Sequence, residues 1–124
     1  MSLASMADYG VEGGSHWLVL SNVFSKEASE VVVYDSMFNT ITASTRAVLD
    51  ILYKNHHEYT IKFAKVQKQT DYTSCGRWAI AYMYDLAMGL DPAATCYNEE
   101  LMADYLLFCL DGGYVMPFPG NRIR

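Results

Sequence analysis

The sequence predicts an α+β fold in which a small, mostly antiparallel sheet packs on a central helix. Runs rich in aromatic and β-branched residues predict three strands, at 16–24, 30–35 and 60–66. Runs with apolar residues at helical spacing predict three helices, at 44–55, 75–88 and 98–110. The 124 residues are enough for one domain with a hydrophobic core and too few for two.

Two strands are predicted from runs of apolar residues, and the third from the alternation of apolar and charged residues. HWLVLSNVF and EVVVYDS are separated by a length that suits a hairpin connection, so we expect them to pair antiparallel. In YTIKFAKVQ, Ile61 and Phe63 alternate with Lys62, as in a strand with one buried face.

The three helices differ in how much of their surface is apolar. The first is amphipathic, with Ser44 as its expected N-cap and a buried face of Ala47, Val48, Ile51 and Leu52. The second is apolar or aromatic almost throughout and should be the core helix, ended by Gly89. The third has Asn98 as its expected N-cap, and its apolar face comprises Leu101, Met102, Tyr105, Leu106 and Cys109.

Composition and charge exclude several classes of protein. Hydrophobic residues make up 52% of the chain and charged residues 19%, which is typical of a globular protein and not of a disordered one. The net charge of -5 offers no basic field for nucleic acid. No apolar run reaches the about 18 residues of a membrane span, so we expect an intracellular protein without a membrane partner. Residues 1–15 are interpreted as a flexible lead-in or expression remnant before a single domain at 16–124.

The cysteines and histidines predict neither disulfides nor a metal site. Cys75, Cys96 and Cys109 form an odd set without a CxxC pair, which argues against a disulfide framework and against zinc, and fits a reducing compartment. His56 and His57 are consecutive and lack a third ligand at metal spacing, so a solvated helix end is the better interpretation. No cofactor is expected.

Cys75 lies where a polar loop meets the core helix, and this position suits a nucleophile. The N–H groups and dipole of a helix N-terminus stabilise a thiolate. Gly76 leaves room beside the sulfur for a substrate carbonyl. A small buried core residue is the alternative interpretation, and for a lone cysteine it is the commoner one.

Three further residues complete a possible catalytic set. His16 and Asp35 lie at the edges of two strands expected to be adjacent, where an imidazole base and an orienting carboxylate could meet the thiol. Gln69, six residues before Cys75, could supply an oxyanion donor worth about 3 to 4 kcal/mol in the transition state. Spacing alone does not separate Gln69 from Gln67, and His16 or Asp35 taken singly could be a strand-edge or turn residue.

The order of these motifs resembles the Ulp1/SENP-type ubiquitin-like-protein cysteine proteases of the adenain-like clan. The matching segments are HW at His16, VVVYDS ending at Asp35 and Ser36, Gln69, and CG at Cys75. The segments WAIAYMYDLAMGLDP and EELMADYLLFCL are similar to a branch found in transposable elements. The loop TDYTSC departs from the family pattern, which often has an aspartate directly before the cysteine.

The resemblance implies a papain-like fold, here truncated, and a hydrolase that cleaves after the C-terminal glycine of a ubiquitin-like modifier, most simply a SUMO-like one. It implies Gln69 rather than Gln67 as the oxyanion donor, and Trp17 and Gly76 as substrate-binding residues. The family's domain begins well before its histidine, so a second chain or a longer parent protein could supply that part. The nucleus or cytoplasm is the expected location.

Three alternatives remain open at this stage. The chain could be an inactive module that still binds a modifier, or a protease that processes the polyprotein of a mobile element. An acyltransferase with the same triad ranks last, because this acidic chain offers no evident basic site for an acyl donor or its activator.

Overall fold

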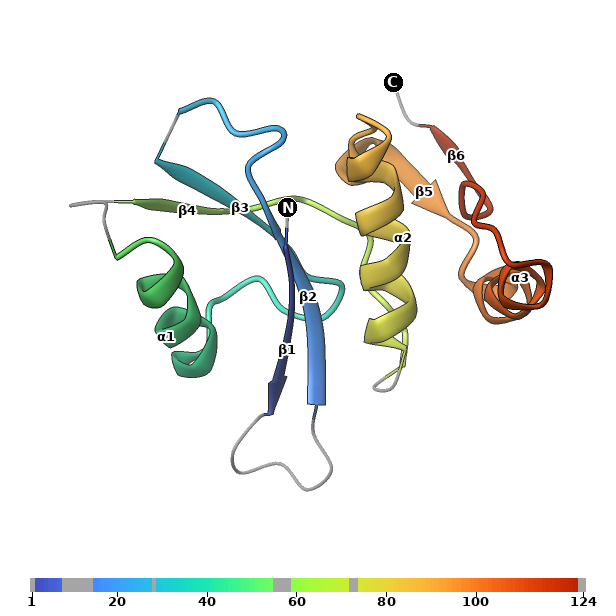
Figure 1. The fold of residues 1–124 in the computed structure, drawn as a ribbon, viewed down its shortest axis with the longest axis horizontal. Helices are drawn as coiled ribbons and strands as arrows, with labels where there is room; N and C mark the ends of the chain where they lie inside the picture. The colour runs from blue at the N-terminus through green and yellow to red at the C-terminus, as the bar shows by residue number, and fades with distance from the viewer. Residues whose placement is uncertain (1, 8–14, 28, 55–58, 72–73, 123–124) are drawn as a thin grey trace.

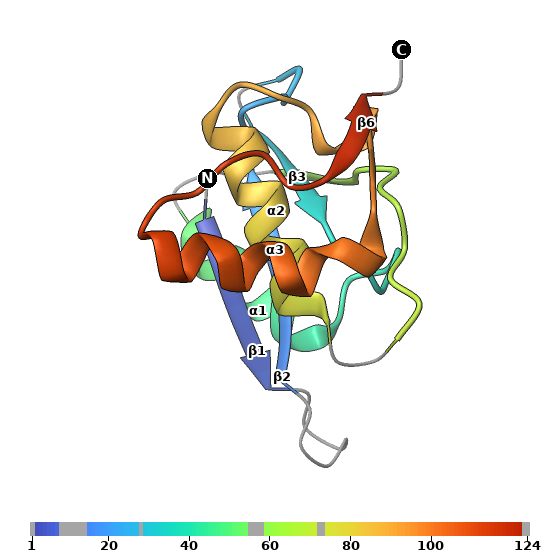
Figure 2. The same ribbon diagram turned by 90° about the vertical axis from the view of Figure 1, so that its right-hand side faces the viewer.

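The computed structural model describes residues 2–7, 15–27, 29–54, 59–71 and 74–122, and for residues 2–7 and 15 it describes the backbone alone. The α+β architecture is confirmed: a four-stranded sheet lies between helix α1 (Ala43–Leu52) and helix α2 (Cys75–Ala87) (Figure 1). Helix α3 (Glu99–Gly112) and a two-stranded sheet lie on the other side of α2 (Figure 2).

The four-stranded sheet is mostly antiparallel, as expected. Its strands are β1 (Ser2–Ala7), β2 (Ser15–Ser21), β3 (Glu30–Tyr34) and β4 (Thr60–Phe63), in that spatial order. The β1/β2 and β2/β3 pairs are antiparallel, whereas β3 and β4 are parallel. A parallel pair needs a crossover connection, and the segment that contains α1 provides it.

Residues 2–7, within the segment interpreted as a flexible lead-in or expression remnant, form strand β1. Ser2–Ala7 pairs with residues 15–20 of β2, with Ser5 opposite Trp17. The run SLASMA has no β-branched residue, and pairing with the exposed edge of β2 determines its conformation instead of local propensity. The sheet therefore extends beyond the boundary expected at residue 16.

Alternate residues of β2 and β3 build two separate cores. Leu18, Leu20 and Val33 face α1, where Leu49 is fully buried. Val19 faces α2 and packs in a cluster with Trp78 and other aromatic side chains. This two-sided burial explains why β3 reads as an unbroken run of valines, since both of its faces are covered.

The expected buried face of α1 is wrong. The helix buries Thr45 and Leu49, which lie one turn apart, whereas Ile51 is 70% exposed and Leu52 is 55% exposed. The apolar residues of this segment allow two orientations of the helix about its own axis. Packing against the sheet favours the orientation in which Leu49 is buried. The N-cap is Thr42, whose side chain accepts from the Thr45 N–H at 3.2 Å, and not Ser44.

Helix α2 is the core helix, as predicted. Trp78, Tyr82 and Leu86 are buried along it. The helix ends at Ala87, and Gly89 follows with φ +74°, a left-handed conformation that glycine adopts at little cost. Within the described ranges, no helix is long and apolar enough to cross a membrane.

Helix α3 follows its predicted pattern closely. Met102 and Cys109 are buried, and Tyr105 and Leu106 pack against the α2 core. Leu101, which was expected on this face, is exposed, as are Leu107 and Phe108 on the outer side. Asn98 occupies the N-cap position without a side-chain capping bond.

The second sheet joins the end of the chain to α2. It pairs β5 (Thr95–Tyr97) antiparallel with β6 (Gly120–Arg122). A Cβ at Gly120 would lie 2.5 Å from the Cys96 carbonyl oxygen, so only glycine fits there. The short 3₁₀ helix η1 (Pro92–Ala94) leads from α2 into β5.

A buried carboxylate holds this second sheet against α2. Asp85 accepts a hydrogen bond from the Tyr97 hydroxyl at 2.6 Å and pairs with Arg122 at 3.1 Å. Burial and the bond to Asp85 raise the pKa of Tyr97 well above its usual range, and the bond to Asp85 raises that of Arg122. A buried charge needs such partners, so Asp85 ties α2, β5 and β6 together.

We expect Tyr97→Phe to lower the free energy of unfolding by about 1 to 3 kcal/mol, because it removes a donor from a buried carboxylate. Urea denaturation followed by circular dichroism measures the effect. Tyr114→Phe, at an exposed position after α3, is the matched control and should change stability little. Equal unfolding midpoints for the two variants would contradict this role of Asp85.

Candidate active site

His16 and Asp35 meet because β2 and β3 are antiparallel. His16 lies near the start of β2 and Asp35 directly follows β3, and His16 Nε2 is 2.9 Å from Asp35 Oδ1. Asp35 is only 3% exposed, and its Oδ1 also accepts from the N–H groups of Met37 at 2.8 Å and Phe38 at 3.0 Å. The carboxylate is thus fixed by its own turn and orients the imidazole.

The other imidazole nitrogen is available for chemistry. His16 Nδ1 is buried and has no hydrogen-bond partner among the described residues. The Phe38 ring meets the imidazole edge to face, with 5.1 Å between ring centroids. If Nε2–H donates to Asp35, Nδ1 carries the free lone pair and is the atom that could take a proton.

Cys75 is the first residue of α2. The first N–H groups of a helix have no intrahelical acceptor, and the helix dipole is positive at this end. The residue is 4% exposed. Within the described residues, neither His16 nor Asp35 is hydrogen bonded to its sulfur.

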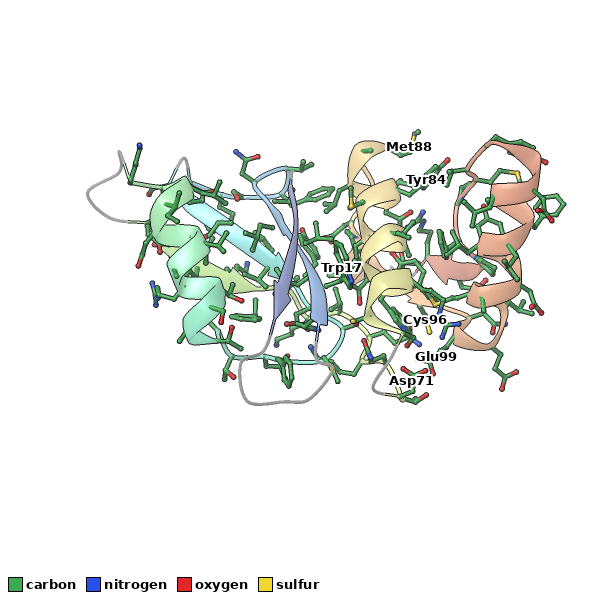
Figure 3. All side chains as sticks on the ribbon, turned by 60° about the horizontal axis from the view of Figure 1, so that its bottom comes forward. Trp17, Asp71, Tyr84, Met88, Cys96 and Glu99 are labelled. Atoms are coloured by element: carbon green, nitrogen blue, oxygen red, sulfur yellow. The ribbon has the colours of Figure 1, made fainter. Side chains whose placement is uncertain are left out.

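Trp17 connects the histidine strand to the start of α2. A Cβ built on Gly76 would lie 3.7 Å from Trp17 Cδ1, so the indole borders the residue that follows Cys75. Figure 3 shows Trp17 between β2 and the helix. Because Trp17 is 37% exposed, its ring forms an accessible surface beside Gly76.

The two glutamines that spacing could not separate have different partners. The Gln67 side chain donates to the Tyr97 carbonyl at 3.1 Å and accepts from the Tyr97 N–H at 2.8 Å, so both ends of its amide are used by β5. Gln69 instead accepts from the Ser36 hydroxyl, next to Asp35, and its backbone N–H donates to the Ser36 carbonyl at 2.9 Å. Of the two, Gln69 lies beside the His16–Asp35 pair.

The Gln69 side-chain amide also contacts the loop before α2. Its Nε2 donates to the Asp71 carbonyl at 2.9 Å. The same nitrogen also donates to Asp71 Oδ1 at 3.5 Å, so its second hydrogen is directed to Asp71 as well. Gln69 therefore links the Asp35 turn to the loop that leads to Cys75.

Lys68 is a residue of this region that the sequence reasoning missed. Its ammonium donates to the Asp35 carbonyl at 2.8 Å and to the Phe38 carbonyl at 3.3 Å. Burial lowers the pKa of Lys68, and the nearby Asp35 charge acts in the opposite direction. In the sequence it is one of several lysines in a polar run, and no spacing marks it as the one that holds the Asp35 turn.

Two carboxylates fix the loop between Gln69 and Cys75. Asp71 Oδ1 accepts from the Ser74 N–H at 2.9 Å and from its hydroxyl at 2.6 Å, so Ser74 occupies the N-cap position of α2 without capping it. Glu99, in the first turn of α3, accepts from both the N–H and the hydroxyl of Thr70. Asp71 and Glu99 lie near the start of α2 in Figure 3.

The remaining candidate residues fall outside this site. Cys109 is buried in the α3 core and Cys96 is exposed on β5, and both are free thiols, as is Cys75. Across the described ranges, no three histidine, cysteine or acidic side chains are grouped so that they could hold a metal ion. His56 and His57 lie outside the described residues.

Comparison with known proteins adds no relative. No protein-family model matches the chain, and searches of curated proteins and of solved structures gave no significant match. Functional inference therefore rests on the motifs and geometry of this chain.

We expect Glu99→Ala to accelerate hydrogen exchange of the Thr70 amide by about tenfold, because the variant removes its acceptor. Residue-resolved exchange followed by NMR measures the rate. Glu100→Ala is the matched control, since Glu100 is also an acidic residue of the first turn of α3 and is exposed. The same exchange rate in both variants would contradict anchoring of the loop by Glu99.

Proposed function

We propose that the protein is a cysteine protease in which Cys75 is the nucleophile, His16 the base and Asp35 the orienting carboxylate. The observation that carries the proposal is the His16 Nε2 to Asp35 contact of 2.9 Å, which leaves Nδ1 buried and unpartnered. The contact of Trp17 with the position of Gly76 supports it, because it brings the histidine strand to the start of the cysteine helix.

The proposed reaction has two steps. His16 Nδ1 takes the Cys75 thiol proton, the thiolate attacks the scissile carbonyl carbon, and the tetrahedral intermediate collapses to a thioester as protonated His16 donates to the leaving amine. Water, deprotonated by His16, then attacks the thioester carbonyl and releases the acid and the thiol. The Cys75 N–H and the Gln69 amide would hold the oxyanion in both steps, with the amide exchanging its long contact to Asp71 Oδ1 for the substrate oxygen.

The substrate we propose is the C-terminal tail of a ubiquitin-like modifier, SUMO-like in the first instance, cut after its last glycine. The indole of Trp17 beside Gly76 would make a narrow wall that favours a glycine without a side chain. Such conjugates occur in the nucleus and cytoplasm. A second chain or a longer parent protein would contribute to gripping the body of the modifier.

The second candidate is a binding module that no longer catalyses. It is favoured by Cys75, which is 4% exposed and has no hydrogen bond to His16 within the described residues. Catalytic hydrogen bonds often tighten only when substrate binds, so this geometry is compatible with either function. The two differ in whether Cys75 reacts with a bound modifier.

We expect Cys75→Ala to reduce cleavage of a modifier fused through its C-terminal glycine to background while the protein stays folded. Gel analysis of the cleavage products and far-UV circular dichroism give the two readouts. Cys96→Ala is the control. Cys96 is an exposed cysteine on β5, outside the candidate site, so this variant should retain activity. Cleavage that persists in Cys75→Ala would exclude Cys75 as the nucleophile.

Labelling by modifiers that carry a C-terminal thiol-reactive group should separate protease from binding module. We expect one modifier to label Cys75 at least about tenfold faster than the free reactive group does, because binding positions the carbonyl against the sulfur. Intact mass measures the labelling, with Cys75→Ala as control. Saturable binding of a modifier without labelling would favour the non-catalytic module.

A further inference from the structure

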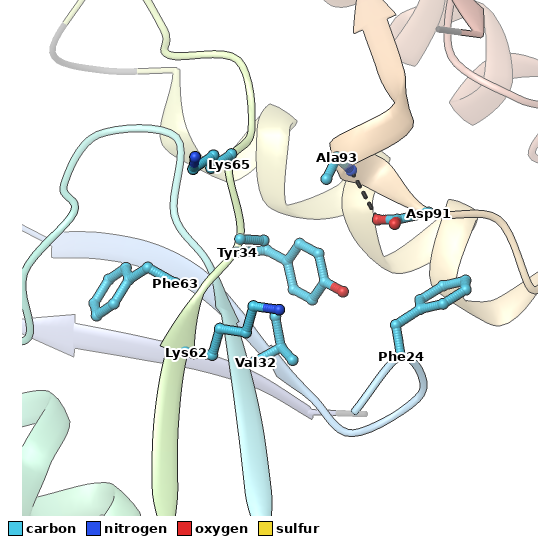
Figure 4. A pocket seen from close by; sticks show the side chains of 9 residues that line it. Phe24, Val32, Tyr34, Lys62, Phe63, Lys65, Asp91 and Ala93 are labelled. Atoms are coloured by element: carbon cyan, nitrogen blue, oxygen red, sulfur yellow. Dashed lines mark hydrogen bonds between the residues drawn. The ribbon is translucent and has the colours of Figure 1, made fainter. Parts of the chain in front are cut away.

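A pocket of about 440 Å³ lies at the end of the molecule opposite Cys75. It is bounded by β3, by the chain from Lys62 to Lys65, by Phe24, and by the turn at Asp91 that follows α2 (Figure 4). Cys75 begins α2 and Asp91 follows its end, and 13 helical residues span about 20 Å. The volume falls in the range of small-molecule sites, and the pocket is separate from the candidate active site.

The strand register determines which side chains enter this pocket. Val32 pairs with Lys62 in the parallel β3/β4 ladder, so both lie on the face of the sheet that is directed toward α2. Tyr34 lies on the same face. Figure 4 shows the Lys62 ammonium close to Tyr34 and Val32, whereas the Phe63 ring extends to the other side.

The Tyr34 hydroxyl is an unpartnered polar group directed into the pocket. The residue is only 1% exposed, and among the described residues burial and the Asp91 charge act on its hydroxyl, but no hydrogen bond does. Figure 4 shows the hydroxyl pointing toward Asp91 and Phe24. Burial, with a smaller effect of Asp91, raises the pKa of Tyr34 to about 12, so the group stays a neutral donor at physiological pH.

The pocket also carries charges of both signs. Lys62 and Asp91 line it and form no ion pair with each other in the described part of the chain, and Lys65 is a second cation of the lining, whose ammonium Figure 4 shows directed away from Tyr34 and Asp91. Asp91 Oδ1 accepts from the Ala93 N–H at 2.9 Å, which fixes the carboxylate and leaves Oδ2 for another donor. The partly exposed Phe24 ring supplies apolar surface next to these groups.

We infer that this pocket binds a free apolar α-amino acid. The ligand carboxylate would accept from the Lys62 ammonium and the Tyr34 hydroxyl, its ammonium would donate to Asp91, and its side chain would pack on Phe24. A simple amine would be repelled by Lys62, and a ligand that carries only an anion would leave Asp91 unpaired, whereas a zwitterion satisfies both Lys62 and Asp91. This inference is independent of the proposed protease activity.

Titration with L-phenylalanine, followed by NMR chemical shifts, tests the inference. We expect saturable binding with shifts at Tyr34, Lys62 and Ala93. Two analogues serve as ligand controls, 3-phenylpropionate without the ammonium and phenethylamine without the carboxylate, and each should bind at least about tenfold more weakly. Equal binding of either analogue would overturn the assignment of a zwitterion site.

Variants test the individual groups. Tyr34→Phe removes only an unpartnered hydroxyl and Lys62→Met only a charge at an exposed position, so both should fold, and each should weaken L-phenylalanine binding by about tenfold. Lys54→Met, at an exposed position after α1, makes the same charge change away from the pocket and should leave binding unchanged. No saturable binding, or the same affinity in all three variants, would overturn the proposal.

Discussion

The antiparallel pairing of β2 with β3 is the constraint on which the remaining structure depends. Its register places Val19 opposite Tyr34, and alternation then assigns Leu18 and Leu20 to one core and Val19 to the other. A shift of this register by one residue would turn every side chain of β2 to the opposite face of the sheet. The residues of one core would then face the other core. The same register brings His16 to Asp35.

Polar contacts then join the sheet, the loop before α2 and the second sheet. Lys68 and Gln69 hold the turn after β3, Glu99 holds Thr70, and Gln67 holds Tyr97. All of these contacts come from the short segment 67–70. The chain therefore fixes the entry to α2 by hydrogen bonds to three separate elements, while apolar packing fixes the body of the helix.

The sequence predicts those features that depend on local pattern. The α+β class, the central helix from Cys75 and its end near Gly89 follow from apolar runs and from glycine. The buried face of α1 does not follow, because its apolar residues fit two rotations and only the sheet selects Leu49. Strand β1 was also missed, since pairing with β2 and not propensity makes SLASMA extended.

Some residues of the candidate site could likewise be predicted from the sequence, and others could not. The identities of His16 and Asp35 could be chosen from their order and their positions at strand edges, and the structure brings them together. Gln67 and Gln69 could be distinguished only once the position of β5 was known. Gln67 binds Tyr97 of β5, which lies 30 residues away in sequence. Lys68 could not be found at all, because a lysine bound to two carbonyls has no sequence pattern of its own.

The Asp85 network has a consequence for the order in which the chain can fold during synthesis. Asp85 is buried in α2, yet its cation Arg122 lies 37 residues later. While the ribosome is still making the intervening residues, burial of α2 would leave a carboxylate without its counter-charge, which is unfavourable. The core around α2 should therefore close late, after β6 has emerged, whereas the layer of β2, β3 and α1 can form earlier.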